Sequence, residues 1–181
     1  MGSPEVKVTV FCSSLSHPGD PEYTQGLMLG KLLGEAGHTV LTGGYIGSME
    51  AVSRGAAEAG GHVIGVTCQE IEDWRPSRAN PWVLEEQKYP TLRDRLFALL
   101  DGCDAAIALP GGIGTLAEIS MLWSHLQTAV LSPRKLIVIG DGWKTVLETF
   151  WKTFDGQIAP KYRSLVTFVP DVEQAVRFLA E

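Results

Sequence analysis

Hydrophobic and polar positions follow two patterns that alternate along the chain. Short, nearly continuous apolar runs are separated by stretches in which apolar residues recur every three or four positions. The short runs predict buried β-strands, and the longer pattern predicts amphipathic helices. We expect strands at residues 8–12, 38–42, 62–66, 105–109, 136–139 and 165–169.

Four helices are expected between these strands. The first begins at Asp20-Pro21 and ends near Gly37, and the second covers 48–59. The third opens at Thr91, which with Asp94 resembles a capping box, and the fourth follows the fourth strand. Their apolar sides are Tyr23, Leu27, Met28 and Leu32 in the first, Leu92, Leu96, Leu99 and Leu100 in the third, and Leu116, Ile119, Trp123, Leu126 and Val130 in the fourth.

Regular alternation of strands and helices predicts the fold class. A parallel crossover needs a helix to return the chain to the same edge, so the pattern indicates a doubly wound, Rossmann-like α/β fold with helices on both faces. With 181 residues, 45% of them hydrophobic, the chain suffices for one core, and residues 1–181 are interpreted as a single nucleotide-binding α/β domain. Ligands of such sheets bind beyond the carboxyl ends of the strands.

Charge and cysteine usage narrow the range of partners. Against 21 Asp and Glu stand 15 Lys and Arg, a net charge of −6 that disfavours a nucleic-acid partner. The sequence shows neither a secretory leader pattern nor an apolar stretch long enough for a bilayer, so we expect no membrane partner. Three dispersed cysteines are typical of buried free thiols, and the four histidines lack metal-ligand spacing. A cytoplasmic protein without a metal is therefore expected.

The segment 105–118 contains the strongest chemical signal. An apolar run breaks into the turn Pro110-Gly111-Gly112-Ile113-Gly114-Thr115 and reopens as a helix that carries Glu118. Glycines let successive N–H groups converge, and the free amides of a helix N-terminus attract an anion. The segment therefore predicts a phosphate cradle with an acid beside it. In the alternative interpretation, Thr115 and Glu118 merely form a capping box.

Two further turns are expected at the same edge. Cys12-Ser13-Ser14 leaves the first strand, and Thr42-Gly43-Gly44-Tyr45-Ile46-Gly47 leaves the second, so the three turns are expected to form one crevice for a mononucleotide. No P-loop motif occurs. Residues 112–117 match the dinucleotide fingerprint, and with Asp141 as ribose acid they leave a nicotinamide enzyme as a distant alternative. Ordinary tight connections would explain each turn singly.

These residues carry a family resemblance. The run Val10-Phe11-Cys12-Ser13-Ser14, the pattern Gly43-Gly44-x-x-Gly47-x-Met49 and the segment 110–118 together resemble the LOG family of cytokinin-activating phosphoribohydrolases. The resemblance extends over most of the chain, and its P-G-G-x-G-T-x-x-E element is specific. Departures are Ser13-Ser14-Leu15 for the family's G-S-S, Thr42 for its first glycine, Ser48 and Glu50 in its G-L-M-G, and Leu96 in its R-K pair.

The resemblance implies an activity and its residues. The reaction is hydrolysis of the N-glycosidic bond of a nucleoside 5′-monophosphate, AMP or N6-modified AMP, to free base and ribose 5-phosphate. Arg95 and Glu118 are the implied catalytic residues, with Arg93 as a competitor for the arginine, and at least a homodimer without a cofactor is implied. The implied substrate-binding residues are Ser13, Ser14, Gly43, Gly44, Gly47, Met49, Gly111, Gly112, Gly114 and Thr115.

The side chains suit this chemistry. Departure of a base develops positive charge on the ribose, which a carboxylate stabilises while it orients or deprotonates water. Arg95 would hold Glu118 ionised or bind a sugar or phosphate oxygen, and Glu50 is a possible second acid that more simply complements a helix N-terminus.

Two other functions are weighed against hydrolysis. A non-catalytic nucleotide or molybdenum-cofactor carrier has similar glycine turns. A lysine decarboxylase is disfavoured because nothing marks a Schiff-base lysine. Two features remain open: Trp74 and Trp82 flank a proline-broken loop that either lids a base pocket or packs on the surface, and Trp123 with Leu126 is a candidate contact to a second subunit.

Overall fold

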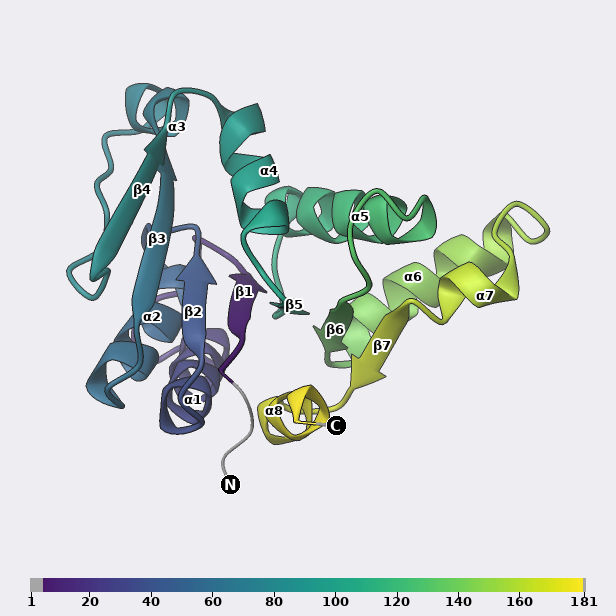
Figure 1. Ribbon diagram of the computed structural model, residues 1–181, viewed down its shortest axis with the longest axis horizontal. Helices are drawn as coiled ribbons and strands as arrows, with labels where there is room; N and C mark the ends of the chain where they lie inside the picture. Colours follow the sequence, from purple (N-terminus) through teal and green to yellow (C-terminus); the bar gives the residue numbers. More distant parts are fainter. Residues whose placement is uncertain (1–4, 181) are drawn as a thin grey trace.

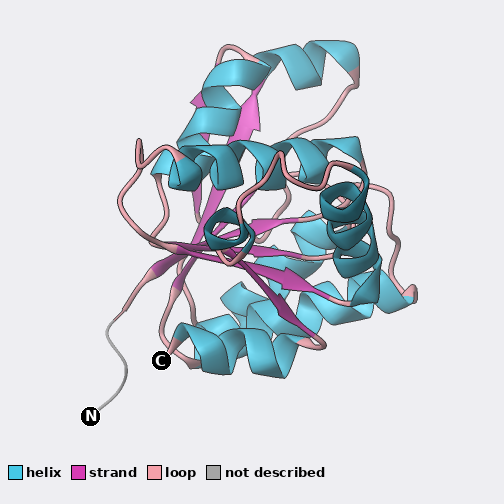
Figure 2. Cartoon of the chain, turned by 90° about the vertical axis from the view of Figure 1, so that its right-hand side faces the viewer, coloured by secondary structure: helices cyan, strands magenta, loops and turns pink. Residues whose placement is uncertain are grey.

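The computed structural model describes residues 5–180, in which seven parallel strands form one sheet. Helices cover both sides of this sheet (Figure 2). The strands are β1 (Lys7–Phe11), β2 (Thr39–Thr42), β3 (Val63–Cys68), β4 (Glu85–Tyr89), β5 (Ala105–Ala108), β6 (Lys135–Ile139) and β7 (Val166–Val169). The α/β fold class predicted from the sequence is confirmed.

The strand order, β4-β3-β2-β1-β5-β6-β7, places a topological switch point in the middle of the sheet. The chain starts at β1, winds outward to β4, returns to pair β5 with β1 and then winds outward on the other side. Val8 pairs with Ala105 and Phe11 with Ala108, so the carboxyl ends of these two strands lie side by side. Doubly wound sheets bind ligands at such a point.

Two apolar layers enclose the sheet. Successive residues of a strand point to opposite faces, and accordingly Val8 and Val10 belong to one core while Phe11 belongs to the other. Helices α1, α2 and α8 cover the first face, and α4, α5 and α6 cover the second (Figure 1). The helices are α1 (Pro21–Glu35), α2 (Ser48–Glu58), α3 (Gln69–Trp74), α4 (Leu92–Asp101), α5 (Ile113–Gln127), α6 (Asp141–Thr153), α7 (Pro160–Arg163) and α8 (Val172–Leu179).

Local signals set several of the helix ends. The Thr91 hydroxyl accepts the Asp94 N–H at 3.0 Å and donates to its carboxylate at 2.7 Å, so the predicted cap of α4 is confirmed. Gly37, with φ of +76°, follows the end of α1. Within residues 5–180, no helix combines the length and the apolar character needed to cross a bilayer.

The strand that sequence patterning missed is β4. Its residues, Glu-Glu-Gln-Lys-Tyr, pair in parallel with β3 at the edge of the sheet and are half-buried at most. An edge strand needs no apolar run, and charged residues there discourage pairing with other chains. The boundaries of the six predicted strands otherwise shift by at most two residues.

Three predicted apolar positions are wrong. Met28 is 42% exposed, because α1 turns its glycines, Gly26, Gly30 and Gly34, toward α2 together with Leu29 and Leu33. Leu92 is half-exposed in the first turn of α4. Val130 lies beyond the end of α5, where the preceding Ala129 adopts a φ of +54°.

Candidate active site

Backbone hydrogen bonds hold the three predicted turns together at the switch point. The Leu109 N–H donates to the Phe11 carbonyl at 2.9 Å and brings the turn after β5 beside the turn after β1. The Ser48 N–H donates to the Ser13 carbonyl at 2.9 Å and ties the second turn to the first. A Cβ on Gly47 would lie 2.7 Å from the Ser14 Cα, so this contact requires glycine. The three predicted turns therefore lie side by side at the carboxyl edge of the sheet, and the ligand crevice between them stays a prediction.

The first turn of α5 is open to a ligand. Gly112 precedes the helix, and the first helical bond runs from the Leu116 N–H to the Gly112 carbonyl at 3.0 Å, so the amides of residues 113–115 have no partner within the helix. A Cβ on Gly112 or Gly114 would meet nothing within 4 Å. Convergent amides, a positive helix end and free space are what an anionic group requires.

The Thr115 side chain supports this turn from within. It is 2% exposed, and its hydroxyl lies where a Cβ on Gly111 would be placed. Because Gly112 is the N-cap and makes no side-chain capping bond, Thr115 lies inside the helix and does not pair with Glu118 in a capping box. The capping-box interpretation of these two residues is wrong.

The second turn is occupied by internal bonds. The Gly44 N–H donates to the Thr42 hydroxyl at 3.1 Å, and the Gly44 carbonyl accepts the Asn80 N–H at 2.8 Å. Gly43 is in contact with the Met49 sulfur and the Arg95 guanidinium, since a Cβ there would overlap the latter. Gly43, Gly44 and Met49 are buried, so this turn offers few free groups to a ligand.

Arg95 is a buried side chain that braces the second turn. It is 7% exposed; its Nε donates to the Val66 carbonyl at 2.8 Å, and its Nη2 donates to the Gly43 carbonyl at 3.1 Å. The guanidinium carbon lies 5.7 Å from the centre of the Tyr45 ring. Arg93, the competing arginine, is exposed and lies over Phe97 at 5.9 Å. Of the two, only Arg95 is directed into the fold.

Glu118 has the electrostatic character of an acid–base group. Burial raises the pKa of its carboxyl from 4.5 to about 7, and the positive charge of Arg95 opposes part of that rise. The Cys12 thiol belongs to the same group of side chains: burial raises its pKa, the Glu118 charge adds to the rise, and the Arg95 charge opposes it. Glu118, Arg95 and Cys12, from three different segments, therefore lie within one another's electric fields.

Other candidate residues have structural partners or lie elsewhere. Glu50 is in the first turn of α2 and accepts a hydrogen bond from the Tyr23 hydroxyl at 3.2 Å. Asp141 is exposed in the first turn of α6. Trp123 is packed inside the chain, where its indole N–H donates to the Tyr162 carbonyl at 2.7 Å, and it is no free contact for a second subunit. The homodimer implied by the resemblance stays a prediction.

Asn80 and Tyr45 are two residues that sequence reasoning missed. Asn80, 6% exposed, belongs to the proline-broken loop, and Tyr45, 1% exposed, lies between the glycines of the second turn. Their hydrogen-bond partners are distant in sequence, so local patterns do not reveal them. The only available signals were that Asn80 is a polar residue between two prolines and that Tyr45 is an aromatic residue between two glycines. Of the two tryptophans that flank this loop, Trp74, at the end of α3, is 79% exposed, whereas the half-buried Trp82 lies under Arg54 at 5.5 Å.

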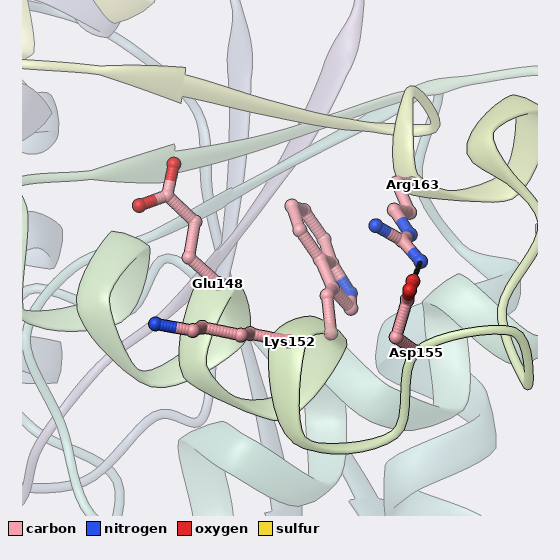
Figure 3. A pocket seen from close by; sticks show the side chains of 5 residues that line it. Glu148, Lys152, Asp155 and Arg163 are labelled. Carbon is pink, nitrogen blue, oxygen red and sulfur yellow. Dashed lines mark hydrogen bonds and ion pairs between the residues drawn. The ribbon is translucent and has the colours of Figure 1, made fainter.

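A surface hollow of about 330 Å³ lies away from the crevice (Figure 3). Its lining comes from the end of α6 and from α7, with Glu148 and Lys152 on one side and an Arg163–Asp155 ion pair of 3.0 Å on the other. Since α6 starts at the carboxyl edge of the sheet, its end lies toward the opposite edge. None of the predicted site residues lines this hollow.

The fold and site define a doubly wound α/β protein in which an open helix N-terminus, the half-buried acid Glu118 and the buried Arg95 belong to elements that meet at the switch point. A family model described as possible lysine decarboxylase matches residues 49–179. A probable cytokinin riboside 5′-monophosphate phosphoribohydrolase of Oryza sativa subsp. japonica is 30% identical over 97% of this chain and 78% of its own length. A cytokinin riboside 5′-monophosphate phosphoribohydrolase of Arabidopsis thaliana is 30% identical over 97% of this chain and 81% of its own length. The chain belongs to the LOG family.

Solved structures show the same fold. A molybdenum cofactor binding protein from Rippkaea orientalis has a TM-score of 0.75 at 21% identity, over 97% of this chain and 96% of that one. The molybdenum cofactor carrier protein of Chlamydomonas reinhardtii has a TM-score of 0.72 at 21% identity and the same coverage. At this identity the likeness concerns the fold alone.

The lysines offer no support for a decarboxylase. Among residues 5–180, six lysine side chains are exposed and only Lys135 is half-buried. The Lys135 ammonium donates to the Phe178 carbonyl at 2.6 Å, at the amino end of β6 and far from the glycine turns. A Schiff-base lysine needs a desolvated amine beside the substrate, which this arrangement does not provide.

Proposed function

We propose that the protein hydrolyses the N-glycosidic bond of a nucleoside 5′-monophosphate, AMP or an N6-modified AMP, to the free base and ribose 5-phosphate. The observation that carries the proposal is the carboxyl of Glu118, with a pKa of about 7, on the helix whose first turn offers an open anion cradle. The names of the LOG relatives support the same reaction class.

In this proposal, phosphate binding and catalysis are carried out by groups one helical turn apart on α5. The 5′-phosphate would bind the amides of residues 113–115, where it interacts with the positive end of α5. Glu118 lies one turn further along, within reach of a pentose attached to that phosphate. Interactions with the non-reacting phosphate would then position the glycosidic carbon beside the carboxyl.

The reaction needs water and one ionised carboxylate. As the C1′–N9 bond breaks, its electron pair leaves with the base and positive charge develops on the ribose, which the Glu118 carboxylate stabilises. The water oxygen bonds to C1′ while Glu118 accepts a proton from that water, and the departing base takes up the proton. Arg95 favours the ionised state of Glu118 through its charge.

The second candidate function is a non-catalytic carrier of a nucleotide or of the molybdenum cofactor. Its support is the fold shared with proteins described as molybdenum cofactor binding or carrier proteins. A carrier needs the open turn of α5 but no acid with a raised pKa, so the two functions differ in what Glu118 does.

The test is release of free base from AMP and from N6-isopentenyl-AMP, followed by liquid chromatography. Wild-type protein is expected to release base. Glu118→Gln should lower the rate by about 10²- to 10⁴-fold, because a positioned acid–base group contributes that much, while calorimetry shows retained nucleotide binding. Glu50→Gln, which removes another carboxylate at the same edge, serves as the matched control and should turn over normally.

Two outcomes would overturn the proposal. Binding of AMP without base release by the wild type would favour the carrier, and turnover unaffected by Glu118→Gln would remove the assigned role. Arg95 is a poorer test of chemistry, because its removal leaves the Val66 and Gly43 carbonyls without their partner and costs about 1–3 kcal/mol of folding stability for each such group.

A further inference from the structure

Asn80 is a buried residue that binds the second glycine turn through both its backbone and its side chain. Its backbone N–H donates to the Gly44 carbonyl at 2.8 Å. Its side-chain Nδ2 donates to the Gly44 carbonyl at 3.1 Å and to the Tyr45 carbonyl at 3.0 Å. The Oδ1 accepts the Trp82 N–H at 3.1 Å, so both ends of the amide are used.

The turn that Asn80 binds also contacts Arg95. We call the two residues of this turn that contact its guanidinium, Gly43 and Tyr45, the Arg95 socket. Gly43, the residue before Gly44, accepts the Arg95 Nη2, and the Tyr45 ring lies 5.7 Å from the guanidinium carbon. Tyr45 is itself fixed, since its hydroxyl donates to the Cys68 carbonyl at 3.0 Å and accepts the Cys68 N–H at 2.7 Å. A shift of Gly44 and Tyr45 would therefore move two of the contacts that set the position of Arg95.

We infer that Asn80 is a positioning residue: by locking the carbonyls of Gly44 and Tyr45 it fixes the socket of Arg95 and thereby the distance from that guanidinium to the Glu118 carboxyl. Asn80 does not touch the reacting atoms. The inference rests on the proposed function for its kinetic consequence, but the geometry it describes exists whether or not the protein turns over a nucleotide.

The electrostatic consequence follows from the groups that face Glu118. Arg95, from α4, is the charged group that acts on the Glu118 carboxyl, and the Cys12 thiol, after β1, lies within the fields of both. Burial keeps the Cys12 thiol neutral near pH 7, so Arg95 supplies the opposing charge. If Arg95 moves away, the pKa of Glu118 must rise, because burial then acts with less opposition.

The experiment is a ¹³C NMR titration of the Glu118 carboxyl, assigned by its loss in Glu118→Gln, in wild type, Asn80→Ala and Asn80→Asp. Asn80→Ala removes the side-chain donations to the Gly44 and Tyr45 carbonyls and to the Ser53 hydroxyl, together with the acceptor of the Trp82 N–H. Asn80→Asp places an acceptor against two carbonyl oxygens. We expect the titration midpoint to rise by about half a pH unit or more in both variants, more in Asn80→Asp. If the protein turns over AMP, a rise of half a pH unit from about 7 should lower kcat about twofold at pH 7, with a smaller change in KM.

Val63→Ala is the control for a merely structural effect. Val63 is fully buried at the amino end of β3, away from the crevice, so this variant loses stability without touching the Arg95 socket. It should lower the melting temperature and leave the midpoint unchanged. A midpoint in the Asn80 variants equal to that of Val63→Ala would overturn the inference. Absence of base release in wild type would count against the proposed function alone, because the titration is independent of turnover.

Discussion

Glycines in two regions of this molecule have opposite structural roles. Between α1 and α2, the space that a Cβ on Gly30 would need is filled by the Val52 carbonyl, and a Cβ on Gly34 would lie 2.7 Å from the Ala56 carbonyl oxygen. In the first turn of α5, the same space at Gly112 and Gly114 is empty. One region uses the missing side chain to bring two helices together, and the other leaves the backbone accessible.

The difference shows that a glycine in a motif must be interpreted with its neighbourhood. Gly43 and Gly44 belong to the recognised motif, yet the first makes room for Arg95 and the second approaches Gly65 and Thr67. They act as packing residues at the site, as Gly30 does away from it. Gly112 and Gly114 are the motif glycines that leave amides free for a ligand.

Filling a glycine of the helix contact is expected to have the largest effect on stability. Gly30→Ala places a methyl group on the Val52 carbonyl and should lower the free energy of unfolding by about 3 kcal/mol, since the two helix backbones must separate. Gly142→Ala, in the first turn of α6 with no atom within 4 Å of the added carbon, should be neutral or slightly stabilising. Urea denaturation of both variants measures the difference. Equal stability of the two would show that the α1–α2 contact is not tightly packed.

Glu118 should give the open region a distinctive pH dependence. Below pH 4.5 its carboxyl is neutral in the folded and unfolded chains. Between pH 4.5 and about 7 only the unfolded chain ionises, so stability is lost as the pH rises, by at most about 3 kcal/mol above pH 7 relative to Glu118→Gln. The value of kcat/KM should rise about tenfold per pH unit below pH 7 and level off above it, because the ionised form acts.

Denaturation of wild type and Glu118→Gln at pH 4 and pH 8 checks the first expectation, and a pH–rate profile checks the second. A difference in stability that stays constant between these pH values would place the carboxyl in water rather than in the interior.

Filling the open glycine should affect binding and spare the fold. Gly114→Ala is expected to weaken AMP binding about tenfold, or 1.4 kcal/mol, while the melting temperature stays near that of wild type. The control is again Gly142→Ala, because Gly142 is the second residue of α6 as Gly114 is of α5. Calorimetric titration with AMP distinguishes them. Unchanged affinity in Gly114→Ala would mean that the phosphate binds elsewhere.

Much of the fold could be predicted from the sequence because its signals are local. Apolar runs gave six of the strands, and capping residues and glycines gave the ends of several helices. The edge strand β4 could not be predicted, because it has no buried face to leave an apolar pattern. Met28 was wrongly placed on the buried side of α1 because hydrophobicity ranks it above Gly30, whereas close helix contact favours the smaller residue.

The candidate site divides in the same way. The cradle and Glu118 follow from one continuous segment, so their arrangement could be predicted from spacing. The bracing of Arg95 by the Val66 and Gly43 carbonyls, and of the second turn by Asn80, joins residues that are far apart in sequence. Such contacts exist only after the sheet has formed, and no local pattern encodes them.

The return of the chain from the sheet's edge to its centre has a consequence for how the site comes into being. Arg95 lies on the crossover that ends the first half of the sheet, and Glu118 lies on the first helix of the second half. Neither half holds both residues, and the halves are joined by the pairing of β5 with β1, among the most sequence-distant contacts in the molecule. If the chain were divided between α4 and β5, one fragment would contain Arg95 and the other Glu118. Base release that returns when the two fragments are mixed would therefore report their reassembly.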